Sequence, residues 1–310
     1  MKVLFTEELI CYDGINSFIY TCIKEFAHLG ISCSLYVKNK EQESSKDWIL
    51  KFSQYCRIYF EEEIPKEKYN IIYHNSNKIN PLLFNSKDNR FFVHGSTSKN
   101  LTPLETFLYN KVYFFSEKIF NWSKMSQLPN KELIRQPIDI DRFSYSPSSK
   151  QIKKILIVDS RNAYKYLYNF LEIGAKIEAY ISYLGRGPLG LSNVKFDLEN
   201  AIKEADLIVG YGRCIYEAMS CGKNVFIYGV NGGDGYLDLS KDSKLNYKKY
   251  LENNMSGWTN HKFNQIEEEM LDIKSAVEEL KIYSPLNGKI NRKMIIKYNN
   301  SKQICPTLLK

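Results

Sequence analysis

The chain has 310 residues, of which 44% are hydrophobic and 25% are charged. These values are near those of ordinary globular proteins and exclude a disordered or collagenous chain. Because 310 residues exceed what one ordinary core holds, we expect two domains. The longest apolar runs stop well short of the roughly 20 residues that a membrane-spanning helix needs. Acids follow the first apolar run where a signal peptide would carry its cleavage region, so we expect no signal peptide.

Seven cysteines are scattered along the chain without any C-x-x-C pair. Such a set encodes neither a disulfide framework nor a zinc site, so we expect reduced thiols and a cytoplasmic protein. The net charge is +8, and the last 30 residues contain seven bases and no acid. A basic tail suits an anionic surface, either a phosphate backbone or the inner face of a membrane to which the protein would bind peripherally. A solvated terminal helix is the alternative.

The first half of the chain alternates short apolar stretches with one clear helical pattern. Residues 2–6 predict a strand, residues 15–30 a helix with apolar residues every three or four positions, and residues 31–37 a second strand. Further short strands are predicted at 57–60, 70–74, 90–94 and 111–116. Strands that are short, apolar and separated by polar loops are typical of a parallel sheet covered on both faces.

A serine-rich segment with Pro147, residues 143–154, interrupts this pattern and predicts a linker. Strands and helices then alternate again as far as residue 229, and a mostly helical region follows, in which 264–283 is the clearest amphipathic segment. We therefore predict an α/β protein with two doubly wound, Rossmann-like domains that face a central cleft. The predicted parts are residues 1–146, residues 147–285 and a basic C-terminal tail at 286–310.

The stretch "VGYGRCIYEAMSCGKNVFIYG", residues 209–229, runs from a strand end through a glycine turn into a short helix and a second strand. In an open α/β sheet, ligands bind where helix N-termini present unpaired N–H groups. A diphosphate at Tyr211, Gly212 and Arg213 would meet backbone donors, a helix dipole and a guanidinium. Glu217, one turn further on, suits the hydroxyls of a ribose. The alternative is a glutamate that only complements the helix dipole.

Part of this stretch, "YEAMSCGKNVFIYG", resembles the E-A-M-A-x-G-x-P-V signature of nucleotide-sugar-dependent glycosyltransferases with the GT-B fold, chiefly the large retaining group called family four. Asn224 stands where that family usually has proline. Two other segments resemble further parts of the family pattern. The glycine loop, first helix and second strand are matched by "DGINSFIYTCIKEFAHLGISCSLYV", and the interdomain segment by "LIRQPIDIDRF". The resemblance covers most of residues 1–235. It implies transfer of a hexosyl or pentosyl group from a nucleoside diphosphate sugar to an acceptor hydroxyl, with a retaining outcome favoured over an inverting one.

The resemblance also implies roles for individual residues. Glu217 would bind the ribose, while Arg161 in "VDSRNAYK" and Lys165 would hold the donor diphosphate. Gly14 would bring its backbone close to that diphosphate, and His94 in "FFVHGS" would face the transferred sugar. The alternatives are an exposed loop pair for Arg161 and Lys165, and a purely structural histidine.

The glycine-rich segment "VNGGDGYL" follows the next strand, so Gly233 and Asp234 are predicted to lie in a loop near the donor, with a plain turn as the alternative. Two features depart from the family pattern. Val209 stands where the family has an earlier glutamate, and Asp13-Gly14 replaces a Gly-Gly pair. Both departures weaken the assignment to the retaining family, although they leave the predicted fold and nucleotide site in place.

Positive side chains and a helix N-terminus can stabilise a departing diphosphate, so we expect no essential metal and no cofactor apart from the nucleotide-sugar co-substrate. The Asp-x-Asp match at 139–141 falls in the interdomain segment and is discounted as a metal site. A retaining enzyme would use a donor phosphate oxygen to remove the acceptor proton, whereas an inverting enzyme would need a carboxylate base. Asp13 is the candidate base, followed by Glu7 and Glu8.

Three functions stay open at this point. The first is a glycosyltransferase whose acceptor is a glycan or a lipid-linked sugar at an anionic membrane. The second is a DNA-modifying glycosyltransferase of the bacteriophage type, which the positive net charge would suit. The third is a catalytically silent GT-B subunit that binds a nucleotide or a partner, and the missing acid at Val209 motivates it.

Overall fold

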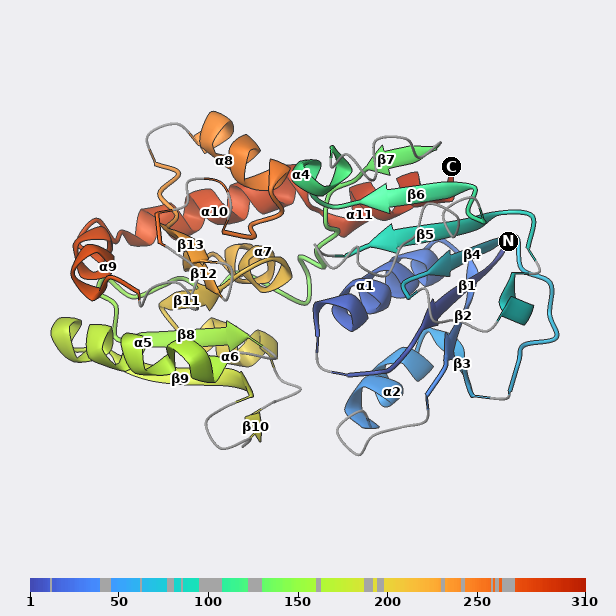
Figure 1. Ribbon diagram of the computed structural model, residues 1–310, viewed down its shortest axis with the longest axis horizontal. Coiled ribbons are helices and arrows are strands. Elements are labelled where there is room, and N and C mark those ends of the chain that lie inside the picture. The colour runs from blue at the N-terminus through green and yellow to red at the C-terminus, as the bar shows by residue number, and fades with distance from the viewer. Residues whose placement is uncertain are drawn as a thin grey trace. The chain divides into compact units, whose positions relative to one another are not determined.

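The chain folds into two compact units, shown in the computed structural model of Figure 1. Unit 1 consists of residues 1–137 together with 301–310, and unit 2 of residues 138–300. None of the described helices is long and apolar enough to cross a membrane. The structure describes residues 1–11, 13–39, 46–61, 63–76, 81–84, 86–94, 108–121, 130–159, 163–186, 192–193, 198–229, 232–240, 243–257, 259, 262–263 and 271–310.

Unit 1 is built on a seven-stranded parallel sheet of order β3-β2-β1-β4-β5-β6-β7. From β1 the chain winds outward to β3 and then returns to the other side of β1 at β4, which is the doubly wound pattern. All the strands predicted in this half are present; β7 and α2 were not predicted. The elements are β1 (Lys2–Glu7), α1 (Gly14–His28), β2 (Ser32–Val37), α2 (Lys46–Ser53), β3 (Cys56–Phe60), β4 (Ile71–His74), η2 (Pro81–Leu83), β5 (Asn89–Val93), β6 (Lys111–Phe114), α4 (Glu117–Phe120), β7 (Lys131–Leu133), α11 (Ser301–Ile304) and η5 (Cys305–Leu309).

Unit 2 is built on a six-stranded sheet of order β10-β9-β8-β11-β12-β13, in which only the two outer strands are antiparallel. Its strands bury both faces, since Leu156 packs on one side and Ile155 and Ile157 on the other. This confirms the prediction of a second doubly wound unit. The elements are β8 (Lys154–Asp159), α5 (Ala163–Ile177), β9 (Tyr180–Arg186), β10 (Ser192–Asn193), α6 (Leu198–Glu204), β11 (Leu207–Gly210), α7 (Arg213–Ser220), β12 (Asn224–Gly229), β13 (Gly232–Tyr236), α8 (Ser243–Glu252), α9 (Ile273–Leu280) and α10 (Pro285–Tyr298).

The division between the units lies at 137/138, whereas the sequence suggested 146/147 and a serine-rich linker. Ile138 and Phe143 are fully buried in the core of unit 2. The serine-rich segment is also fixed to unit 2, because the Asp206 carboxylate accepts hydrogen bonds from the backbone N–H of Ser149 at 3.0 Å and of Lys153 at 2.9 Å. A carboxylate has enough lone pairs to hold several such donors at once. The serine-rich segment is therefore held against unit 2 and is not a free linker.

The segment that the sequence presents as a basic tail is divided between the two units. Its first part forms α10 in unit 2, which buried amides attach to the sheet. The Asn287 side chain donates to the Leu237 carbonyl at 2.6 Å, and its oxygen accepts the Leu239 N–H at 3.0 Å. Asn224 donates to the Ser284 carbonyl at 3.1 Å, just before α10 begins. Asparagine at this position therefore connects β12 to the start of α10 through its side-chain amide, which a proline would lack.

Candidate functional site

The carboxyl end of the unit 2 sheet has its topological switch point between β8 and β11. The chain leaves β8 for β9 on one side and returns to β11 on the other, so the segments after β8 and β11 diverge at this edge. Ligands of open α/β sheets bind at such points. The end of β11 packs closely against the end of β8, because a Cβ on Gly210 would lie 2.7 Å from the carbonyl oxygen of its register partner Val158.

Gly212 is the N-cap residue of α7 and leaves open space where this helix begins. Its backbone has φ 65° and ψ −134°, a conformation that L side chains rarely adopt, and no side chain caps the helix here. No described atom lies within 4 Å of the position that a Cβ on Gly212 would take. Its own N–H donates to the Met255 carbonyl at 2.8 Å, which fixes the turn. The start of α7 therefore offers backbone N–H groups and open space together, as an anionic ligand requires.

Arg213 and Glu217 form a buried ion pair one turn apart on α7. The Arg213 Nε donates to Glu217 Oε1 at 2.9 Å, and the two side chains are only 5% and 2% exposed. These two groups were predicted to bind a diphosphate and a ribose separately, whereas the structure joins them. A buried carboxylate is stable only when it is paired and well oriented. The pair therefore presents a fixed carboxylate beside the start of α7.

Val209, where the resemblance would place a glutamate, lies within β11. It is fully buried and pairs in register with Ile157 of β8 and Phe226 of β12. A carboxylate there would enter an apolar core and lose its hydration without compensation. A valine at this position therefore fits its buried, paired place in β11.

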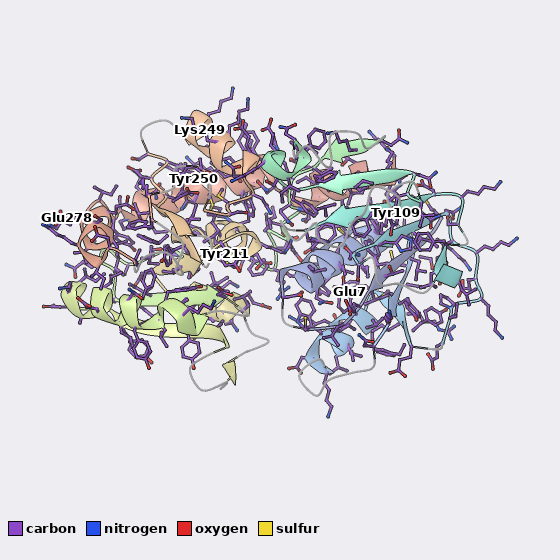
Figure 2. All side chains as sticks on the ribbon, viewed as in Figure 1. Glu7, Tyr109, Tyr211, Lys249, Tyr250 and Glu278 are labelled. Atoms are coloured by element: carbon purple, nitrogen blue, oxygen red, sulfur yellow. The ribbon has the colours of Figure 1, made fainter. Side chains whose placement is uncertain are left out.

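Tyr211, labelled in Figure 2, closes the turn between β11 and α7. Its ring covers Gly229 at the end of β12 so closely that a Cβ there would lie 2.2 Å from the ring. Gly233 and Asp234 were expected in a loop, but they form part of strand β13, which pairs antiparallel with β12. Gly233 is required for packing, because its Cβ would lie 2.3 Å from the Ile227 carbonyl oxygen. Contact of Gly233 and Asp234 with a donor stays a prediction.

The segment after β8 supplies the predicted Arg161 and Lys165. Arg161 lies outside the described residues, and Lys165 lies in the first turn of α5. At the end of β8, the buried Asp159 accepts a hydrogen bond from the Tyr166 hydroxyl at 2.9 Å. Burial and the neighbouring Asp159 carboxylate raise the pKa of Tyr166 well above its usual value. This pair was not predicted, although an acid at the end of an apolar strand was the available signal.

The predicted residues of unit 1 lie at the carboxyl edge of its sheet. Asp13 is the N-cap of α1, where Oδ1 accepts the Asn16 N–H at 2.9 Å and Oδ2 accepts the Cys11 thiol at 3.2 Å. Gly14 is the first residue of that helix. His94 follows β5, and its Nε2 lies 2.8 Å from Oδ1 of Asn75. Both oxygens of Asp13 are thus occupied within the protein, and the catalytic roles of Asp13 and His94 stay predictions.

Comparison with known proteins supplies the fold but no close relative. No protein-family model and no curated protein matches the chain. Among solved structures, an alpha-glucosyltransferase in complex with UDP and a 13-mer DNA containing a HMU base is similar over 100% of this chain and 98% of that one, with 12% identity and a TM-score of 0.63. TarM of S. aureus, in complex with Fondaparinux, alpha-GlcNAc-glycerol and UDP, matches over 99% of each chain at 11% identity and a TM-score of 0.62. MurG of Acinetobacter baumannii also matches over 99% of each, at 10% and 0.53.

The fold is GT-B. At 10 to 12% identity the likeness shows the fold alone. Within unit 2 the structure brings Tyr211, Gly212, Arg213 and Glu217 together at one strand end. Lys165 belongs to the helix after the neighbouring strand β8.

Glu7 stands out among the acids that the structure describes. It ends β1, at the switch point of unit 1 between β1 and β4. Oε1 accepts the Glu8 N–H at 2.9 Å, while the buried Oε2 has no hydrogen-bond partner among the described residues. Burial, and after it the neighbouring Asp13 carboxylate, raises the pKa of Glu7 to about 8. Glu7 therefore carries a proton at neutral pH; the sequence analysis named it only in reserve behind Asp13.

We expect Glu7→Gln to stabilise the GT-B chain in alkaline solution. The folded pKa of about 8 exceeds the ordinary value of 4.5. The contribution of the protonated acid to the free energy of unfolding is therefore fully present below pH 4.5. It falls as the pH rises from 4.5 and is lost once the pH passes 8. Glutamine cannot ionise, so the variant should match the wild type near pH 5 and gain about 2–4 kcal/mol above pH 8. Urea unfolding between pH 5 and 9 measures this, and a difference that does not change with pH would contradict the assignment.

Proposed function

We propose that the protein is a glycosyltransferase that moves a hexosyl or pentosyl group from a nucleoside diphosphate sugar to an acceptor hydroxyl. One observation carries this proposal: at the switch point of unit 2, the open glycine that starts α7 lies one turn before a buried, arginine-paired carboxylate. The first feature suits a diphosphate and the second a ribose. The likeness of fold to glycosyltransferases solved with UDP supports the same interpretation.

In the proposed donor complex, Glu217 accepts hydrogen bonds from the ribose hydroxyls. The diphosphate lies at Gly212 and the first turn of α7, with Arg161 and Lys165 as further positive groups. Arg213 contributes its charge at this end of the helix while it holds Glu217 in place. Fixed positive groups and backbone donors stabilise the charge that develops as the nucleoside diphosphate leaves. We propose that this set performs the task without a metal ion.

The proposed acceptor side belongs to unit 1, where His94 would face the transferred sugar. We propose a retaining reaction, in which a donor phosphate oxygen removes the acceptor proton. An inverting reaction would instead need a carboxylate base in unit 1. Neither Glu7 nor Asp13 is ready for that role, because Glu7 holds a proton at neutral pH and both Asp13 oxygens accept hydrogen bonds, and this supports the retaining proposal.

A thermal-shift screen against UDP, GDP, ADP and their sugars tests the donor site. A ligand that binds only the folded chain raises its melting temperature, and saturation at 100 times Kd adds about 2.7 kcal/mol. Turnover of the stabilising sugar nucleotide should then release free nucleoside diphosphate when an acceptor is present. Binding without release under any acceptor would instead support the catalytically silent subunit. No shift with any nucleotide would contradict the proposal.

Gly212→Ala is expected to weaken nucleotide binding by about tenfold or more. The added methyl group meets no described atom, so its effect comes from the backbone conformation and from the space that the ligand would use. Gly30→Ala is the matched control, because Gly30 also has a positive φ, 75°, and no described atom near its Cβ position. Both variants should lose some stability, and only Gly212→Ala should lose affinity in calorimetric titration. Equal nucleotide affinity in the two folded variants would contradict the proposed position of the diphosphate at the start of α7.

We propose a glycan or a lipid-linked sugar as acceptor. A modified base in DNA is the second candidate, because the net charge is +8 and one solved structure with this fold is in complex with a 13-mer DNA containing a HMU base. Affinity for DNA would fall steeply as salt increases, since phosphate contacts release counterions. Transfer assays with glycan, lipid-linked and DNA acceptors distinguish the two candidates directly.

A further inference from the structure

Helix α10 exposes a row of lysines to solvent. Its buried side carries Asn287, Asn291 and Ile295. The opposite side carries the exposed Lys289, Lys293 and Lys297, which recur every four residues. The 14 residues of α10 include no acid, so nothing on this helix neutralises the row.

Aliphatic side chains interrupt the same row. Leu286 is 59% exposed and Ile296 is 39% exposed. At 100° per residue, both lie on the side of the helix that the three lysines occupy. Scattered exposed aliphatics are common on protein surfaces. Two of them within one lysine row give this helix a solvent side that is both positive and apolar.

Helix α8 extends the positive surface. It packs against α10, and the Tyr247 hydroxyl donates to Asn299 at the end of α10. Lys244, Lys248 and Lys249 of α8 are exposed, and Figures 1 and 2 show α8 beside α10 with Lys249 on its outer side. We call the three lysines of each helix, with Leu286 and Ile296, the lysine face.

Most of these lysines lack an acidic partner within the described structure. In the described residues, the lysine face has one ion pair, between Lys248 and Glu252 at a long 3.8 Å. An exposed lysine elsewhere is paired more closely, since Lys281 lies 2.6 Å from Glu278. The positive charge of the face is therefore available to an external anion.

We propose that the lysine face binds the surface of an anionic membrane. Lysines attract acidic lipid headgroups, and aliphatic side chains enter the boundary between headgroups and acyl chains. Duplex DNA would use the lysines but has no place for Leu286 and Ile296, so the mixed composition favours the lipid surface. The proposal does not depend on the nucleotide site, because its evidence comes from α8 and α10 alone.

Sedimentation of the full chain with vesicles tests this proposal. The wild type should bind vesicles of phosphatidylcholine with 30% phosphatidylglycerol and leave vesicles of phosphatidylcholine alone in suspension. Replacement of Lys289, Lys293 and Lys297 by glutamine should lower the partition coefficient roughly 100-fold. The control replaces Lys150, Lys153 and Lys176, three exposed lysines of the same unit, and should retain most of the binding although it loses the same charge.

A second variant distinguishes a lipid surface from nucleic acid as the partner of the lysine face. Leu286→Ser with Ile296→Ser keeps every charge and should still reduce vesicle binding about tenfold or more. Equal loss in the lysine variant and its control, or absence of charge-dependent vesicle binding, would overturn the proposal. Binding to duplex DNA that needs the lysines and ignores the two aliphatics would also overturn it, and would assign the face to nucleic acid.

Discussion

Deletion of residues 301–310 is expected to unfold unit 1. This segment is part of the core, because Cys305 and Leu308 are fully buried and Cys305 Sγ lies 3.9 Å from Cys22 Sγ of α1. Ser301 donates to the buried Glu25 at 2.7 Å. Removal of one buried leucine typically costs about 2–5 kcal/mol, and a whole domain is stable by only about 5–15 kcal/mol.

The deletion would also expose a charged network of unit 1. The Arg90 guanidinium and the Tyr73 hydroxyl both donate to the Leu308 carbonyl, and the Arg90 side chain is only 3% exposed. A buried donor that loses its acceptor costs a further ~1–3 kcal/mol, and more when it is charged. We therefore expect the loss to exceed the stability of unit 1.

Urea unfolding followed by far-ultraviolet circular dichroism checks this expectation. The truncated chain should show only the transition of unit 2, and a protease should cleave unit 1 without denaturant. Lys302→Ala with Thr307→Ala is the control, because both side chains of this segment are exposed. Two native transitions in the truncated chain would show that the segment is dispensable.

Substitution of Glu217 is expected to separate nucleotide binding from stability. Glu217→Ala leaves the buried Arg213 without its 2.9 Å partner, which costs about 3–5 kcal/mol of unfolding free energy. Glu217→Gln keeps an oxygen that can accept from Arg213 and should cost less. Under the proposed function, both variants weaken nucleotide binding by about 1–3 kcal/mol, because the ribose hydroxyls lose a charged acceptor.

Calorimetric titration of the folded variants with the stabilising nucleotide measures the affinity. Asp206→Asn is the matched control, since Asp206 is a buried acid of unit 2 that holds the backbone of Ser149 and Lys153 and lies on neither α7 nor β11. It should lower stability and leave the affinity unchanged. Unchanged nucleotide affinity in folded Glu217→Gln would give Glu217 a structural role only.

Alternation of apolar strands and helical patterns was sufficient to predict both doubly wound units. Strands such as β11 and β12 are continuous apolar runs because helices cover both faces of their sheet. The division at 137/138 could not be predicted, because the burial of Ile138 and Phe143 depends on contacts far along the chain. Strand β13 was missed for a related reason: its glycines pack against β12, and glycine in a sequence more often indicates a loop.

The candidate site was predictable in place but not in detail. Glycine, arginine and glutamate after a strand indicated the start of α7, and their four-residue spacing already permitted the Arg213–Glu217 pair. The state of Glu7 was not predictable, because its pKa depends on burial at the end of β1 and on Asp13 nearby. An acid at a strand end shows in the sequence; the loss of water around it does not.

The return of the C-terminal segment to unit 1 constrains the order of events during translation. Unit 2 is in effect an insertion of residues 138–300 within unit 1. A ribosome finishes the whole of unit 2 before it makes the last ten residues of unit 1, so the later unit in the sequence can complete its fold first. Until then the side of α1 that contacts this segment stays uncovered, so we expect the nascent chain to be more open to aggregation at unit 1 than at unit 2.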